Sequence, residues 1–81
     1  MKFTSGDIYN GDWYEGQKTG NGYFQYHDGE RYEGKWLHDL KHGLGVYYWM
    51  NGDKFVGEFY EDHIKKGVLH KHNGEVVELM P

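Results

Sequence analysis

The stretch YEGKWLHDLKHGLGVYYWMNGDKF, residues 32–55, decides the fold of this 81-residue chain. It places Tyr-x-Gly-x-Trp first, Gly-x-Gly next, then a group of aromatic residues, and Asn-Gly before the order begins again. The preceding stretch YNGDWYEGQKTGNGYFQYHDGER, residues 9–31, has the same order 23 positions earlier. Self-similarity at a fixed period of this length indicates a repeat architecture.

The chain divides into three copies of this unit and two incomplete ends. We assign one full repeat to residues 9–31, a second to residues 32–54 and a shortened repeat, which lacks one residue, to residues 55–76. Residues 1–8 have the pattern of the tail of a preceding repeat, and residues 77–81 provide a final edge strand. Such ends are also compatible with a fragment of a longer array.

Each copy contains two segments of alternating apolar and polar residues, which predicts a β-hairpin. The expected strands are residues 8–14, 21–27, 31–37, 44–50, 54–60, 66–71 and 75–79. A two-residue Asp-Gly turn would place Tyr32 opposite Gln25 and divide the aromatic residues between the two faces. A three-residue loop, residues 27–29, with its glycine in the left-handed conformation, instead places Phe24 opposite Tyr32.

This register arranges the side chains of one face in three rows across the sheet. The first row is Tyr9, Phe24, Tyr32, Tyr47, Phe55, Leu69 and Val77. The second is Gly11, Gly22, Gly34, Gly45, Gly57 and Gly67, and the third is Trp13, Gly20, Trp36, Gly43, Phe59 and Lys65. The glycine row leaves the large rings space to lie across the backbone. The opposite face is polar apart from Val46, Val56 and Val68, so we expect it to face solvent.

The motifs resemble those of the MORN (membrane occupation and recognition nexus) repeat family over nearly the whole chain. The resemblance implies an all-β fold, an elongated single-layer antiparallel sheet of stacked β-hairpins without helices, with its aromatic residues on the concave side. The chain departs from the pattern at Asp39, which replaces the loop glycine that Gly16 represents. It departs again in the third copy, at Lys65 and Lys71.

A single sheet has no second layer to cover its apolar face, so we expect part of the aromatic surface to bind a partner. The alternative that the rings only form the core stays open. The predicted partner-binding residues are Tyr9, Trp13, Phe24, Tyr26, Tyr32, Trp36, Tyr47, Trp49, Phe55, Phe59, Glu30 and Asp53. Because the last two are carboxylates beside the turns, the trough would suit an amphipathic segment with basic residues.

The sequence thus predicts a non-enzymatic protein–protein interaction or scaffold module. We expect it to dock a protein or peptide segment and to self-associate through its sheet ends, as a homodimer or an end-to-end assembly. Two alternatives stay open. One is a peripheral phospholipid or membrane-surface module, although the lysines Lys18, Lys41, Lys65 and Lys66 are balanced by nearby carboxylates. The other is a regulatory repeat fragment of a larger enzyme.

Composition and local motifs limit the remaining classes of function. A net charge of −4 argues against nucleic acid as a partner. The length of 81 residues predicts one domain, residues 1–81. Because the chain has no cysteine and a mean hydropathy of −0.96, we expect it in the cytoplasm, where partners would attach it to cytoskeleton or membranes. We predict no catalytic residue, cofactor or metal site. His38, His42 and His63 could approach one another, but no carboxylate is well placed to complete a metal site with them. Residues 16–22 resemble a glycine-rich phosphate-binding loop, but they lead into a strand, whereas such a loop opens a helix.

Overall fold

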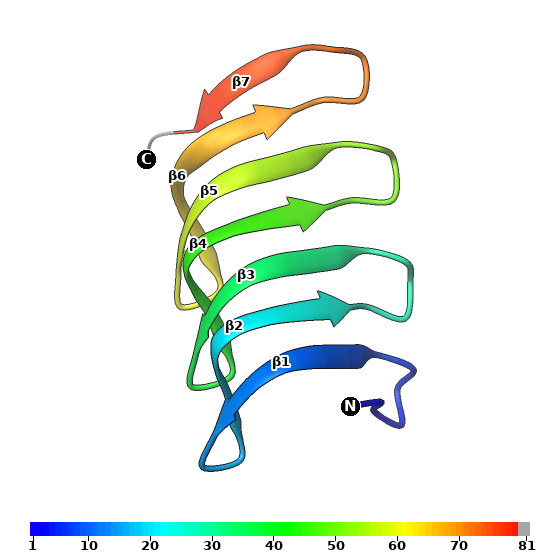
Figure 1. Cartoon of the computed structure of the whole chain (residues 1–81). Helices are drawn as coiled ribbons and strands as arrows, with labels where there is room; N and C mark the ends of the chain where they lie inside the picture. The colour runs from blue at the N-terminus through cyan, green and yellow to red at the C-terminus, as the bar shows by residue number, and fades with distance from the viewer. Residues whose placement is uncertain (80–81) are drawn as a thin grey trace.

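The computed structural model describes residues 1–79 as one seven-stranded antiparallel sheet, in which every strand pairs with its neighbour in the chain (Figure 1). The strands are β1 (Ile8–Tyr14), β2 (Gln17–Gln25), β3 (Arg31–Leu37), β4 (Leu40–Tyr48), β5 (Lys54–Tyr60), β6 (His63–His70) and β7 (Val76–Leu79). The described part contains no helix, and so none that could span a membrane. The sheet is a single layer with extents of 39 × 24 × 15 Å, and the predicted fold class is confirmed. Positions 80 and 81 of the predicted last strand lie outside the described residues.

The Asp-Gly and Asn-Gly ends of the hairpins have the predicted three-residue loop. The Tyr26 amide donates a hydrogen bond to the Glu30 carbonyl at 2.8 Å, and the Gly29 amide donates to the Tyr26 carbonyl at 3.0 Å. Gly29 has a φ of 98°, which favours glycine. The same loop recurs at residues 3–7, 49–53 and 71–75. As a result Phe24 pairs with Tyr32. The first predicted row is confirmed across all seven strands, and the second, the glycine row, across β1 to β6.

The opposite ends of the hairpins differ from the prediction. β2, β4 and β6 begin three or four residues earlier than expected, so the strands meet through two-residue turns rather than long loops. The turn residues are Glu15–Gly16, His38–Asp39 and Glu61–Asp62, and all six have positive φ. Two consecutive residues with positive φ match the twist of a β-hairpin. The sequence signal was weak because five of the six residues are not glycine.

A β-bulge in each hairpin compensates for the longer strands, and it corrects the third predicted row. Trp13 pairs with Lys18 rather than Gly20, and Trp36 pairs with Lys41 rather than Gly43. In the third repeat the bulge is smaller, since one residue is missing there, and Phe59 pairs with Ile64 rather than Lys65. The pairs between repeats, Gly20 with Trp36 and Gly43 with Phe59, are as predicted.

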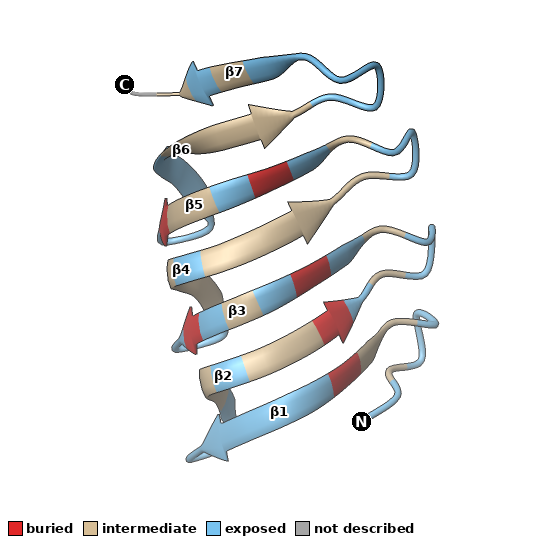
Figure 2. Cartoon of the chain, turned by 45° about the horizontal axis from the view of Figure 1, so that its top comes forward, coloured by how far each residue is buried: buried red, intermediate tan, exposed pale blue. Residues whose placement is uncertain are grey.

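The core lies on the aromatic face, which we define as the face that carries the three predicted rows. Figure 2 marks the buried residues in red along the strands. Its buried members are Tyr9, Phe24, Tyr32, Trp36, Phe55 and Phe59. A Cβ atom on Gly22 or Gly45 would overlap the ring of Tyr9 or Tyr32, respectively. The glycine row therefore provides the space in which these rings lie, as the sequence predicts.

The ring at the Trp position of each later repeat joins that repeat to the one before it. The Trp36 ring meets Tyr32 of its own repeat at a centroid distance of 5.2 Å and Tyr9 of the preceding repeat at 5.7 Å, both edge to face. Phe59 contacts Phe55 at 5.3 Å and Tyr32 at 5.1 Å in the same geometry. Aromatic pairs in this arrangement are favourable beyond the area they bury.

Candidate functional site

The structure divides the twelve predicted partner-binding residues into buried and accessible groups. The six core residues named above have at most 7% of their surface exposed, so they hold the sheet together and present almost no surface to a partner. Tyr26, Tyr47 and Trp49 are half-buried and pack against that core. Trp13 is 41% exposed, because it lies in the first repeat and no earlier repeat covers it.

The two predicted carboxylates, Glu30 and Asp53, are both engaged in hydrogen bonds within the protein. The Tyr47 hydroxyl donates to Glu30 Oε1 at 2.7 Å, and burial followed by this hydrogen bond raises the pKa of the Tyr47 phenol. Asp53 Oδ1 lies 2.9 Å from His72 Nδ1 and accepts from the His72 amide at 2.8 Å. The His72 ring contact, followed by the His72 amide, lowers the pKa of Asp53. Both carboxylates therefore stabilise the turns or the core.

Two lysine side chains, each at the second position of a strand that follows a two-residue turn, lie over the aromatic face. Lys18 Nζ lies 5.3–6.0 Å from the centroids of five rings, including Phe3 and Phe24 near the other end of the strands. Lys41 Nζ lies 5.7–5.9 Å from three rings, which belong to Tyr26, Tyr32 and Tyr47. The strands that carry these residues are arched along their length (Figure 1).

Carboxylates of the next repeat hold both lysines in place, in a pair of contacts that we call the lysine clamps. Asp39 Oδ1 accepts from the Lys18 amide at 2.7 Å and lies 3.3 Å from Lys18 Nζ. Asp62 repeats these contacts with Lys41 at 2.7 and 3.4 Å. The other two lysines that the sequence offered for lipid head groups, Lys65 and Lys66, lie 3.6 and 3.9 Å from Glu58.

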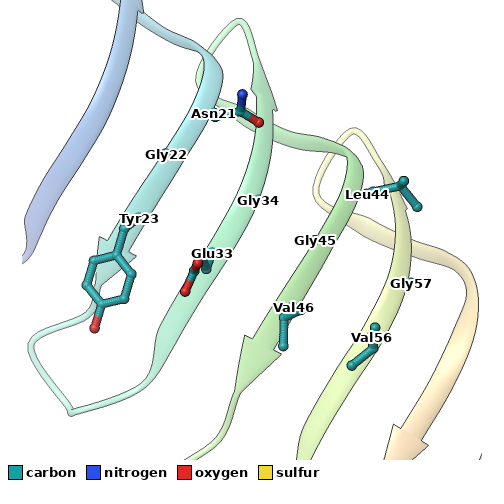
Figure 3. A pocket seen from close by; sticks show the side chains of 10 residues that line it. All are labelled: Asn21, Gly22, Tyr23, Glu33, Gly34, Leu44, Gly45, Val46, Val56 and Gly57. Atoms are coloured by element: carbon teal, nitrogen blue, oxygen red, sulfur yellow. The ribbon is translucent and has the colours of Figure 1, made fainter.

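A broad shallow depression occupies the face opposite the aromatic residues, and we call it the open-face hollow (Figure 3). It has a volume of about 740 Å³. Its lining is Asn21, Gly22, Tyr23, Glu33, Gly34, Leu44, Gly45, Val46, Val56 and Gly57. A second depression of about 270 Å³ shares Leu44 and Gly57 with it and extends it to Val68 on β6. Leu44 is 62% exposed and Val56 is 39% exposed. The sequence placed Val46, Val56 and Val68 on this solvated face but did not predict the depression or the part of Leu44 in it.

The sequence model of the MORN repeat matches residues 9–31 and 32–54. The chain belongs to the MORN repeat family. The two matches cover more than half of the chain and have the same boundaries as the two full repeats deduced from the sequence. MORN repeats are generally non-catalytic modules that bind proteins or membranes. No curated protein matches the chain.

The Asp39 position, which departs from the MORN pattern, leads to a prediction about acid stability. The hydrogen bond from the Lys18 amide lowers the pKa of the Asp39 carboxyl, and the Lys18 ammonium group lowers it further. Partial burial of the carboxyl raises the pKa but only offsets part of this effect. The Asp39 charge stabilises the folded state fully at a pH above the pKa of Asp39 in the unfolded chain, near 3.8. This stabilisation is lost as the pH falls through the lower pKa that Asp39 has in the folded state. We expect Asp39→Asn to destabilise the protein at pH 7 by about 1 kcal/mol, because solvent screens this exposed pair.

Urea denaturation of the wild type and of Asp39→Asn at several pH values measures this effect. The difference between the two proteins should shrink steadily below pH 4. Lys18→Met provides the matched control. If the two charges interact, the double variant Asp39→Asn with Lys18→Met should lose less free energy of unfolding than the sum of the losses of the two single variants. A constant difference from pH 7 to pH 2 would contradict the role of the Asp39 charge.

Two of the histidines considered for a metal site have other neighbours in this MORN chain. Among residues 1–79 no three His, Cys, Asp or Glu side chains are grouped so that they could hold a metal ion. His42 belongs to β4 rather than to a loop, and its ring packs 5.1 Å from the ring of Tyr60. His38 Nδ1 lies 3.0 Å from the side-chain oxygen of Gln17.

Proposed function

We propose that this MORN chain is a non-enzymatic interaction module that docks a segment of a partner protein across the open-face hollow. The observation that carries the proposal is the exposed apolar floor of that hollow, which Leu44, Val46 and Val56 form beside a lane of glycines. A single sheet has no second layer to cover this surface, and exposed apolar patches commonly mark interaction sites. The aromatic face, where the sequence suggested docking, has most of its rings buried.

The shape of the hollow suggests what kind of segment it accepts. It crosses β2 to β5, and neighbouring strands lie about 4.8 Å apart, so the floor is about 14 Å long. An amphipathic helix of about ten residues has this length. Its apolar side would lie on Val46 and Val56, beside the exposed side chain of Leu44. Glu33 in the lining would favour a basic residue at that end of the segment.

A protein segment is favoured over a lipid surface because all four lysines considered for head groups lie near carboxylates. Self-association through the sheet ends stays part of the proposal. It is supported by the exposed ring of Trp13 at the first strand. A cytoplasmic location, with attachment to cytoskeleton or membranes through partners, also stays a proposal.

The proposal is tested with helical peptides selected from a random display library on the wild-type protein. We expect Val56→Glu to weaken binding of the selected peptides about tenfold or more, because it places a charge on the apolar floor. Val76→Glu is the matched control, since Val76 is 61% exposed and lies outside the hollow. Calorimetric titration measures the dissociation constants, and circular dichroism verifies that both variants are folded.

Selected peptides that bind Val56→Glu as tightly as the wild type would contradict docking in the open-face hollow. Vesicles that contain phosphatidylserine provide a second arm of the experiment. Co-sedimentation of the wild type and of both variants with these vesicles, without peptide binding, would favour the membrane alternative.

A further inference from the structure

The two lysine clamps indicate which chemical group the aromatic face accommodates. Lys18 and Lys41 are 23 residues apart and occupy equivalent places in successive repeats. In both, the ammonium group lies within 6.0 Å of several ring centroids, and the side chain is about 85% buried. A lysine ammonium near aromatic rings is attracted by their negative faces, and its aliphatic stem packs on apolar surface.

The third equivalent place has no lysine. The residue 23 positions after Lys41 is Ile64, and the residue 23 positions after Trp36 is the smaller Phe59. A depression of about 170 Å³ opens beside these two residues, and we call it the third-repeat hollow. Its lining is Lys41, Tyr47, Trp49, Phe59, Asp62 and Ile64.

The walls of the third-repeat hollow combine aromatic rings with a partly exposed carboxylate. The rings of Tyr47 and Trp49 lie 5.0 Å apart at an angle of 49°, so they form a continuous wall. The Asp62 side chain is 41% exposed. Lys41, on the same side, lies 3.4 Å from Asp62, and this contact offsets the repulsion that a second cation would meet.

We infer that the third-repeat hollow binds the side chain of a lysine that a partner protein supplies. The stem of that lysine would pack against Ile64 and Phe59, and its ammonium group would lie over Tyr47 and Trp49. The partner would thus complete the series that the protein's own lysines begin in the two preceding repeats. This site is on the aromatic face and goes beyond the proposed docking of a segment in the open-face hollow.

The first test places a lysine in the hollow from the protein itself. We expect Ile64→Lys to raise the Tm by a few degrees relative to Ile64→Met, which has a similar length but no charge. Ile64 is partly exposed, so both variants are expected to fold. An Ile64→Lys protein that is no more stable than Ile64→Met would overturn the inference.

The second test uses small probes and the indole signal of Trp49 in NMR spectra. We expect N-acetyl-lysine amide to shift this signal, and N-acetyl-norleucine amide, which lacks the ammonium group, to bind about threefold more weakly. Ile64→Lys should abolish the shift. Equal binding of the two probes, or equal shifts at the exposed indole of Trp13, would overturn the inference. Neither outcome depends on Val56, so this site and the open-face hollow are tested separately.

Discussion

Gly45→Ala should lower the free energy of unfolding by about 3 kcal/mol, because the new methyl group has no space. A Cβ atom at this position would overlap the hydroxyl and ring of Tyr32. That ring is fully buried and lies between Trp36 and Phe59, at centroid distances of 5.2 and 5.1 Å. It therefore has little freedom to move aside. Small domains are marginally stable, so this loss removes much of the total.

Urea denaturation followed by tryptophan fluorescence measures the effect of Gly45→Ala. Gly16→Ala is the matched control, since no atom lies within 4 Å of the added Cβ. Gly16 has a φ of 77°, so its substitution should cost only about 1 kcal/mol. If Gly45→Ala cost no more than Gly16→Ala, the rings would not depend on the glycine row for space.

Trp36→Ala should lower the free energy of unfolding by about 3–5 kcal/mol, which is typical for removal of a large core ring. The ring of Trp36 is 5% exposed and contacts Tyr9 and Phe24 of the preceding repeat as well as Tyr32 of its own. Its removal would therefore leave a cavity at the junction of two repeats. The indole also donates a long hydrogen bond to the Gly22 carbonyl at 3.4 Å.

Trp13→Ala is the matched control, because Trp13 has the same place in the first repeat. Its ring contacts Tyr9 at 5.0 Å but is 41% exposed, so we expect a loss of about 1 kcal/mol. Denaturation curves of the two variants, measured under the same conditions, give the comparison. Similar losses for the two variants would mean that contacts between repeats contribute little to the stability of the sheet.

The register of the sheet could be predicted because side chains alternate between faces with a period of two. A shift by one residue would move a whole set of side chains to the other face, so the alternation favours the register that keeps Phe24, Tyr32 and Tyr47 together. The bulges and the two-residue turns could not be predicted in the same way. They depend on positive φ at residues such as His38 and Asp39, which the local sequence does not require.

The candidate sites were less predictable than the fold. The sequence identified the aromatic residues but did not indicate which of them are buried, and the structure buries Tyr9, Tyr32 and Phe55 completely. Asp39 was recognised only as a departure from the MORN pattern, whereas the structure shows that it holds Lys18 over the rings. The valines of the open face were recognised from the sequence, but the depression that they line together with Leu44 was not, because its members are spread over separate strands.

The sequence by itself determined the repeat period, the all-β class, the strand order and the face to which each aromatic residue belongs. These properties follow from local alternation and from a 23-residue spacing, both of which are visible in one dimension. Only the tertiary structure decided which rings are buried, where the lysines lie and which face is hollowed. Those properties arise because bulges within the hairpins change the pairing near the two-residue turns, and because residues from different repeats meet there although they share no local pattern.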